Sequence, residues 1–300
     1  MSILSELKVK KIGKILKNEP MSKYTTYKIG GNADYIVFPS SIEKLQILLC
    51  FIKEKNIPYK VIGHGSNLIF SDENYKGIII KLDELDNLEI NGTLIKVGSG
   101  YPTAKLSLRL SKMGLTGFEF ASALPGSIGG AVYMNAGCYN SDMGYVVREV
   151  KVLTPGNTII TLYNKDLDYH YRSSFFQSNP GFICLEATIV LKHGDKAEIM
   201  KIIEDRKERR ISSQPLNFPS AGSVFRNPPD LSAWKLIEDC GLKGKRIGGA
   251  MVSEMHANFI INVGGATAKD VKELIELIKA AVLEKFSINM KCEQEFVNFE

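Results

Sequence analysis

An uncharged stretch at residues 122–137, SALPGSIGGAVYMNAG, constrains the fold of this chain more than any other segment. Glycines recur in it between apolar residues such as Leu124 and Val132. A core helix would not tolerate the glycines, and a loop in solvent would not carry the apolar side chains. We therefore expect a structured segment whose bare backbone amides lie close to a binding partner.

The composition places the chain among ordinary soluble globular proteins. Its 300 residues predict about two domains, and 44% of them are hydrophobic and 24% charged. The net charge of +5 is spread along the chain, and no basic stripe is interleaved with aromatic residues. We therefore expect no nucleic-acid partner, whereas a small polyanionic substrate is compatible with this charge.

The cysteines argue against a disulfide framework. Their number is odd, no CxxC motif occurs, and they lie far apart at positions 50, 138, 184, 240 and 292. Neither disulfides nor a metal site is therefore expected, and a cytoplasmic location is the simplest prediction. The first residues lack the apolar core of a signal peptide, and no stretch approaches the ~20 apolar residues of a membrane span, so no membrane partner is expected.

The hydrophobic pattern predicts a mixed α+β chain. The expected elements are an amphipathic helix at 1–19, a strand–helix–strand unit at 33–63, a strand at 77–82, a hairpin turning on Asn91-Gly92, a helix after Pro102, a hairpin at 146–163, a strand at 182–192, helices at 195–214, 232–244 and 268–286, and strands at 257–262 and at the C-terminus.

The charged helix at 195–214 marks a candidate domain boundary. We expect an N-terminal helix (1–19) and a larger β-rich domain at 20–197, with subdomains at about 20–85 and 86–197. A smaller domain at 198–300 would pack helices on an antiparallel sheet.

Two glycine-rich segments are candidate anion sites. GHGSN at 63–67 follows a predicted strand, and successive amides in such a turn can form a nest for an anion, although a plain turn fits as well. PGSIGG at 125–130 and NAG at 135–137 offer two further sets of amides, which would suit a pyrophosphate. Close packing of backbone against backbone is the alternative. Neither segment matches the GxGxxG fingerprint, so a dinucleotide would bind in a non-Rossmann manner.

Three further segments carry side chains suited to chemistry. Arg172 lies among the rings of YHYRSSFFQ (169–177), where it could bind a carboxylate or phosphate or simply stack on a tyrosine at the surface. Ser223 in PSAGSVFRNP (219–228) has no nearby histidine to make it a nucleophile, but its hydroxyl could exchange a proton. Glu293 and Glu295 would point to one side of a strand, which by spacing alone indicates a solvated edge.

Taken in order, these segments resemble those of the UDP-N-acetylenolpyruvoylglucosamine reductases, flavoenzymes of peptidoglycan precursor synthesis. The similar blocks are YTTYKIGGNADYIVFP (24–39), GHGSNLIFSDENYKGIII (63–80), GFEFASALPGSIGGAVYMNAG (117–137), YRSSFF (171–176), AGSVFRNP (221–228), GKRIGGAMVSEMHANFIIN (244–262) and the last strand. They cover nearly the whole chain. The short loop after Arg172 is typical of the shorter, type II form of the family.

The resemblance implies a fold and a cofactor. The fold would be an FAD-binding domain of the vanillyl-alcohol-oxidase (PCMH) type followed by a smaller α+β substrate-binding domain. FAD would be held non-covalently, NADPH would be the reductant, a UDP-sugar the substrate, and a monomer is expected. The residues that would hold the FAD pyrophosphate are Gly63, Gly65, Ser66, Asn67, Pro125, Gly126, Ser127, Gly129, Gly130, Asn135 and Gly137.

The resemblance also implies a reaction. Reduced flavin would deliver hydride from N5 to the enolpyruvyl carbon, giving UDP-N-acetylmuramate. Arg172 would stabilise the negative charge that spreads into the substrate carboxylate, with Glu293 beside it, and Ser223 would protonate the adjacent carbon. Tyr171 and Asn227 would contact the substrate.

Departures from the family pattern leave alternatives open. Lys28 replaces the usual arginine, and His64 stands where relatives often have Gly or Asn. A histidine in this turn binds the flavin covalently in some oxidases, so an FAD-dependent oxidase of the same superfamily is the alternative function. A slip of two residues would select Glu295 in place of Glu293. A non-catalytic nucleotide-binding module is a third possibility, against which Arg172 and Ser223 argue.

Overall fold

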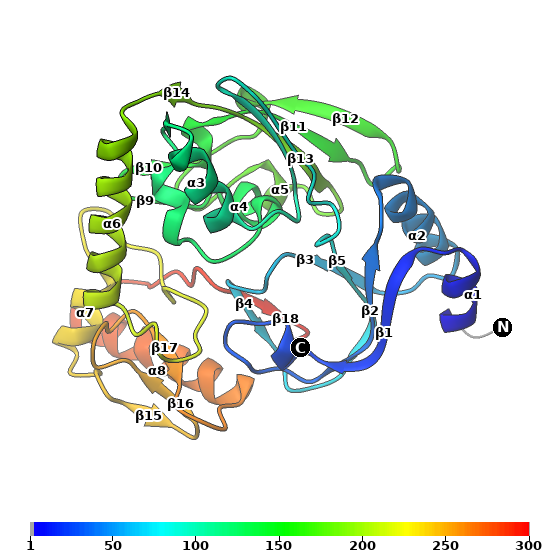
Figure 1. Cartoon of the computed structure of the whole chain (residues 1–300). Coiled ribbons are helices and arrows are strands. Elements are labelled where there is room, and N and C mark those ends of the chain that lie inside the picture. Colours follow the sequence, from blue (N-terminus) through cyan, green and yellow to red (C-terminus); the bar gives the residue numbers. More distant parts are fainter. Residues whose placement is uncertain (1–2, 300) are drawn as a thin grey trace. The chain divides into compact units, whose positions relative to one another are not determined.

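A computed structural model describes residues 3–299 and separates the chain into two compact units (Figure 1). The first unit comprises residues up to 17 together with 35–64 and 76–207, and the second comprises 18–34, 65–75 and the residues from 208 onward. The expected domains were contiguous, whereas the structure groups two short early segments with the C-terminal part of the chain. Helices and strands are mixed in both units, as the expected α+β class requires.

A four-stranded sheet has the order β1-β2-β5-β3. Its strands are β1 (Gly13–Pro20), β2 (Asn32–Pro39), β5 (Tyr75–Lys81) and β3 (Tyr59–Ile62), and α2 (Ile42–Glu54) connects β2 to β3. The predicted strand–helix–strand unit is confirmed, but its two strands are not neighbours because β5 lies between them. The three isoleucines of β5 are fully buried, and so apolar a strand is stable in the sheet interior.

The predicted N-terminal helix is wrong beyond its first turns. Helix α1 covers only Ile3–Val9, residues 1–2 lie outside the described part, and β1 begins at Gly13. Lys11 and Gly13 adopt positive φ angles of 49° and 144°, which a helix does not accommodate. A Cβ on Gly13 would lie 2.1 Å from the Phe38 carbonyl oxygen, so this backbone must approach its neighbour closely.

The first unit also contains a five-stranded antiparallel sheet of order β12-β11-β13-β7-β6. The strands are β6 (Leu88–Asn91), β7 (Leu94–Gly98), β11 (Val147–Leu153), β12 (Ile159–Tyr163) and β13 (Ile183–Val190). Both predicted hairpins are confirmed, but the first turns on Gly92 and Thr93, one residue later than predicted, because Asn91 pairs with Leu94. Helix α3 (Thr103–Lys112) begins directly after Pro102, as expected.

The opening stretch does contain a helix, contrary to our expectation. Helix α4 (Ile128–Met134) is capped by the Ser127 side chain and ends at Asn135 in a left-handed conformation. Its glycine at 129 packs closely against Ser99, because an added Cβ would lie 2.9 Å from the Ser99 Cβ atom and 3.2 Å from its carbonyl oxygen. This short helix therefore accommodates glycine, and at position 129 the close approach of Ser99 requires it.

The second unit contains a three-stranded antiparallel sheet, β15-β16-β17, with helices α7 (Ala233–Asp239) and α8 (Ala268–Phe286). The strands are β15 (Arg246–Ile247), β16 (Ala250–Val252) and β17 (Ile260–Asn262). Helix α7 and strand β17 are shorter than the predicted 232–244 and 257–262. The last strand, β18 (Glu295–Val297), pairs in parallel with β4 (Leu68–Phe70) rather than with this sheet.

Helix α6 (Lys196–Ser213) carries the chain from the first unit into the second. The remaining short elements are β8 (Leu115–Thr116), β9 (Gly137–Cys138), β10 (Ser141–Asp142), β14 (Lys192–His193), α5 (Phe175–Ser178) and the 3-10 helices Met21–Lys23, Glu119–Ala123, Met143–Tyr145 and Asn164–Asp166.

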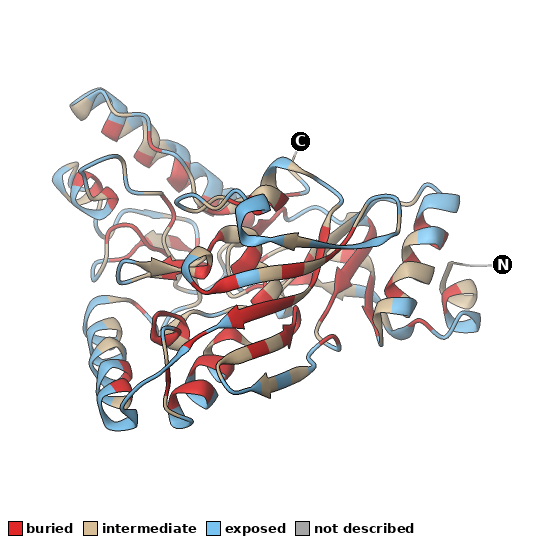
Figure 2. Cartoon of the chain, turned by 90° about the horizontal axis from the view of Figure 1, so that it is seen from above, coloured by how far each residue is buried: buried red, intermediate tan, exposed pale blue. Residues whose placement is uncertain are grey.

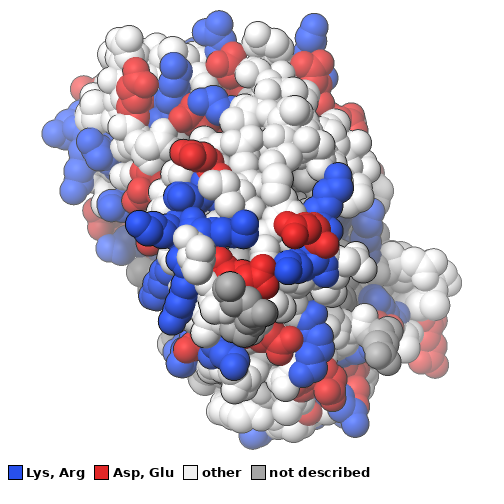
Figure 3. All heavy atoms as spheres, turned by 90° about the vertical axis from the view of Figure 1, so that its right-hand side faces the viewer, with Lys and Arg blue, Asp and Glu red and all other residues white. Residues whose placement is uncertain are grey.

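Burial and charge agree with the sequence pattern. Buried residues concentrate in the strands, while the helices alternate buried and exposed positions (Figure 2). Basic and acidic side chains are interspersed over the face displayed in Figure 3. Within the described residues, no helix combines the length and apolarity needed to cross a bilayer.

Candidate active site

The first unit brings two of the expected FAD segments together. Strands β3 and β5 run parallel with Ile62 opposite Lys81, and Gly63 follows β3 directly. A Cβ on Gly63 would lie 2.6 Å from the Ser127 Oγ atom. The start of the GHGSN turn therefore abuts the PGSIGG segment at the carboxyl ends of two parallel strands.

Fewer amides are available in PGSIGG than the sequence suggests. The Ile128 amide donates to the Tyr101 carbonyl at 2.9 Å, and the Gly129 amide donates to the Ser99 carbonyl at 2.8 Å. The Gly130 amide makes only a long contact of 3.4 Å with Ser127 Oγ. Part of this segment therefore packs backbone against backbone, and its role in binding a ligand stays a prediction.

The end of the GHGSN turn belongs to the second unit, where its residues also have packing roles. Gly65 has a φ of 70°, and a Cβ there would lie 2.1 Å from the Tyr24 carbonyl oxygen. Asn67 Nδ2 donates to the Glu293 carbonyl at 3.1 Å, and the Asn67 carbonyl accepts from the Glu295 amide at 2.9 Å. Ser66, between them, is half-buried.

Ser99 carries a buried hydroxyl group that bears on the ligand of the first unit. Its side chain is 2% exposed, and its Oγ atom has no hydrogen-bond partner among the described residues. Because a buried hydroxyl without a partner is costly, its position beside Gly129 suits a ligand rich in oxygen atoms. The residues present therefore fit FAD, whose phosphates and hydroxyls would meet this hydroxyl and the glycine backbone.

Arg172 is held in a defined position in the first unit. Its Nη2 atom donates to the Gly137 carbonyl at 2.7 Å, and its guanidinium lies 5.0 Å from the centre of the half-exposed Tyr171 ring. The Asn135 side chain donates to the His170 carbonyl and accepts from the Gly144 amide, both at 2.9 Å. Asn135 and Gly137 therefore support the loop that carries Arg172.

The second unit places Ser223 and Glu293 on neighbouring segments of the backbone. The Glu293 amide donates to the Val224 carbonyl at 2.8 Å, and Phe225 forms an antiparallel bridge with Cys292. Ser223 and Glu293 therefore stand on adjacent extended segments. Glu295, by contrast, is the first residue of β18, opposite Leu68.

Gln294 and Tyr27 are the partners that our sequence analysis missed. Gln294 is 3% exposed, and its Nε2 lies 3.2 Å from each of the Ala221 and Gly222 carbonyl oxygens and 3.4 Å from that of Ser223. The Tyr27 hydroxyl donates to Gln294 Oε1 at 3.1 Å. The sequence does contain a signal for Gln294. Side chains alternate along an extended segment, so Gln294 points to the face opposite that of Glu293 and Glu295.

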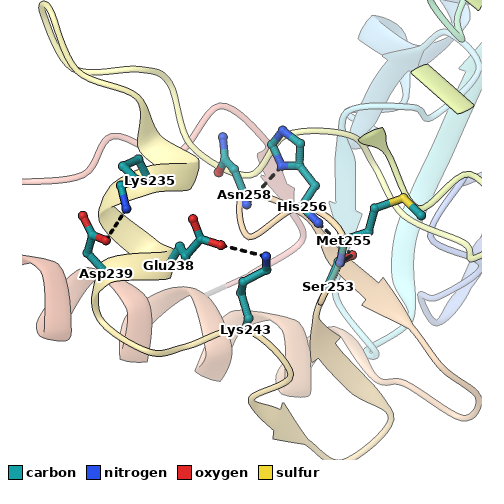
Figure 4. Close-up of polar contacts among 8 residues, drawn as sticks. All are labelled: Lys235, Glu238, Asp239, Lys243, Ser253, Met255, His256 and Asn258. Atoms are coloured by element: carbon teal, nitrogen blue, oxygen red, sulfur yellow. Dashed lines mark hydrogen bonds and ion pairs between the residues drawn. The ribbon is translucent and has the colours of Figure 1, made fainter. Parts of the chain in front are cut away.

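The strand segment after Ser223 is also held from the other side. Asn258 binds both backbone groups of Phe225, at 2.9 Å and 2.8 Å, and the Ser253 hydroxyl accepts from the amides of Met255 and His256 (Figure 4). Figure 4 also shows the Asn258 amide donating to the His256 ring, whose pKa is lowered mainly by burial. The block at 244–262 therefore supports the Ser223 segment.

Asn227 has a structural contact in the same unit. Its Oδ1 atom accepts from the Ala233 amide at 3.0 Å, at the start of helix α7. Its expected role in substrate binding stays a prediction.

Comparisons with known proteins identify both parts of the chain. A model of an FAD binding domain matches residues 33–163, and a model of the UDP-N-acetylenolpyruvoylglucosamine reductase C-terminal domain matches residues 214–297. The UDP-N-acetylenolpyruvoylglucosamine reductase of Bacillus subtilis (strain 168) is 46% identical over 98% of each chain. Reductase 1 of Bacillus cereus is equally similar, with 46% identity over 98% of each chain.

A solved structure agrees with this assignment. The UDP-N-acetylenolpyruvylglucosamine reductase of Thermus caldophilus matches with a TM-score of 0.80 and 33% identity, over 94% of this chain and 98% of that one. The expected order, an FAD-binding domain followed by a smaller α+β domain, is confirmed. The chain belongs to the UDP-N-acetylenolpyruvoylglucosamine reductase family, and it is an oxidoreductase with an FAD-binding domain.

Proposed function

We propose that this protein reduces UDP-N-acetylenolpyruvoylglucosamine to UDP-N-acetylmuramate, with non-covalently bound FAD and with NADPH as the reductant. The family membership supports this reaction, which belongs to peptidoglycan precursor synthesis. The structural observation that supports the proposal is that Ser223 and Glu293 lie on two adjacent backbone segments, joined by the hydrogen bond from the Glu293 amide to the Val224 carbonyl. The expectations of a monomer and of a cytoplasmic location stay predictions.

Bound FAD would supply hydride transfer between NADPH and the enolpyruvyl double bond. Gly63, Ser99 and Ser127 are the residues of the first unit best suited to hold its phosphates. The roles of the residues at 65–67 and 125–130 in binding FAD are part of the same proposal.

Arg172 would stabilise the negative charge that develops as hydride arrives. That charge spreads from the carbon into the adjoining carboxylate, and a guanidinium can meet a carboxylate with two parallel hydrogen bonds. Because the Gly137 carbonyl and the Tyr171 ring already fix the Arg172 side chain, little reorganisation is needed during the reaction. Glu293 would help to polarise the carboxylate.

Ser223 would deliver a proton to the carbon next to the carboxylate. A carbanion is basic enough to accept a proton from a hydroxyl, so no histidine is needed to activate the serine. The position of Ser223 depends on its backbone, which bridges to Phe259 and lies beside the buried Gln294 side chain.

The test separates the two half-reactions under anaerobic conditions. Ser223→Ala should keep rapid reduction of FAD by NADPH but slow reoxidation of the flavin by the sugar nucleotide by orders of magnitude. Glu293→Gln should slow the same step, with Glu295→Gln as its matched control. Ser212→Ala, at an exposed position of α6, controls for a generic serine substitution. If both half-reactions survive unchanged in Ser223→Ala, this serine is not the proton donor.

The same preparation tests the oxidase alternative. An oxidase would be reoxidised rapidly by air but not by the sugar nucleotide. A covalent link through His64 would keep the yellow colour on the chain after denaturation. We expect the colour to leave the chain.

A further inference from the structure

Lys81 is a buried cation at the carboxyl end of strand β5. The residue is 4% exposed, although lysine is among the side chains least often buried. It follows the isoleucine run of β5, which predicts a strand but gives no reason for a charge there. Since a buried ammonium is costly without compensation, its surroundings should reveal what it does.

The Lys81 ammonium lies directly behind the turn that begins at Gly63. Its Nζ atom donates to the Gly63 carbonyl at 2.7 Å. Lys81 stands opposite Ile62, the last residue of β3, so the contact reaches the first residue beyond that strand. The Asp83 carboxylate lies 3.3 Å from Nζ but is 37% exposed, and water therefore weakens its compensation of the charge.

The contact fixes the orientation of one peptide group. In a trans peptide the carbonyl and the next amide point in opposite directions. Because Lys81 holds the Gly63 carbonyl, the His64 amide is directed away from Lys81. Gly63 also abuts Ser127, so this fixed peptide lies beside the PGSIGG segment.

We propose that Lys81 is a positioning residue of the FAD site, where its ammonium orients the Gly63–His64 peptide and supplies positive charge to the FAD diphosphate. The inference rests on the proposed FAD-dependent function. Burial, followed by the positive charge of Lys81, lowers the pKa of His64, so the field of this ammonium reaches the turn. A diphosphate carries two negative charges, which a cation in a poorly solvated position stabilises more strongly than one in water.

The test compares three substitutions in the full-length chain, stripped of flavin and titrated with FAD. Lys81→Met removes the charge and should weaken FAD binding about tenfold or more. Asp83→Asn removes the competing carboxylate and should leave FAD binding unchanged or make it tighter. Lys151→Met, which removes a lysine paired with Glu186 at 3.2 Å on the surface of the same unit, should have no effect.

The direction in which Asp83→Asn changes FAD affinity separates an electrostatic role of Lys81 from a purely structural one. If the Lys81–Asp83 pair merely stabilised the fold, both substitutions would weaken FAD binding and lower the unfolding midpoint of the flavin-free chain together. That result overturns the proposal, as does wild-type affinity in Lys81→Met. If Lys81→Met fails to fold, Asp83→Asn decides alone, because weakened FAD binding in it contradicts the proposal. A wild-type chain that takes up no FAD would overturn the proposed function itself.

Discussion

Replacing Gln294 with methionine should destabilise the second unit more than any conservative change at a neighbouring polar group. The side chain is 3% exposed and lies between the Tyr27 hydroxyl and the carbonyls of the loop that precedes Val224. Methionine preserves the length and volume of the side chain but forms none of these hydrogen bonds. Burial raises the pKa of Tyr27, which keeps its hydroxyl a donor at every working pH.

The magnitude follows from the number of groups that lose a partner. The amide of Gln294 has two hydrogens, so it can satisfy two carbonyls at once. Gln294→Met therefore leaves two carbonyls and the Tyr27 hydroxyl unpaired, which at about 1 kcal/mol or more each costs about 3 kcal/mol. Tyr27→Phe leaves only the Gln294 oxygen unpaired and should cost about 1–2 kcal/mol.

Urea unfolding of the flavin-free chain, followed by tryptophan fluorescence, measures both costs. The chain has one tryptophan, Trp234 in α7, so the signal reports on the second unit. In the holoenzyme, Gln294→Met should also slow flavin reoxidation by the sugar nucleotide, because the Ser223 backbone loses a support. A Tyr27→Phe variant that is less stable than Gln294→Met would refute this reasoning.

Two further predictions concern the first unit. Ser99→Ala should weaken FAD binding about fivefold or more, while the stability of the flavin-free chain stays unchanged or rises. Ser107 is the control, because its hydroxyl already donates to the Phe118 carbonyl at 2.7 Å. Ser107→Ala should therefore lose about 1 kcal/mol of stability and keep its FAD affinity. The reverse pattern in unfolding and FAD titrations would contradict the assignment of Ser99. Burial and the charge of Lys81 lower the pKa of His64, so the unfolded chain binds its proton more readily, and the unfolding free energy should fall as the pH drops below about 6.5. His64→Gln should flatten that fall between about pH 7 and 5, and an unchanged slope would assign the pH dependence to other groups.

Elements whose signals are local could be predicted from the sequence. The hairpin of β6 and β7 turns within one residue of the predicted position and helix α8 agrees with its predicted range, because turn residues and helical periodicity lie within the segment itself. The N-terminal helix could not be bounded in this way. Its apolar and basic alternation continues past Val9, but positive φ angles at Lys11 and Gly13 turn the chain into β1.

The site was predictable in its segments but not in its contacts. Local reasoning selected the glycines at 63 and 129 as positions of close approach, and the structure places other groups within 3 Å of an added Cβ at both. The partners of these glycines come from elsewhere in the chain, such as Ser99 for Gly129. Nothing near residue 129 in the sequence indicates that its amide is already bonded.

The backbone of Arg172 adopts a conformation whose cost the surrounding loop must offset. Arg172 has a φ of 56°, a left-handed conformation that costs a residue with a side chain about 1 kcal/mol. Two reciprocal backbone hydrogen bonds between His170 and Ser173, at 3.1 Å and 3.0 Å, and the Asn135 side chain offset this cost. A glycine at position 172 would relieve the strain but would remove the guanidinium that the loop directs to the Gly137 carbonyl. The loop therefore keeps an arginine at a position where glycine would be less strained, and the proposed contact of its guanidinium with the substrate carboxylate would account for that choice.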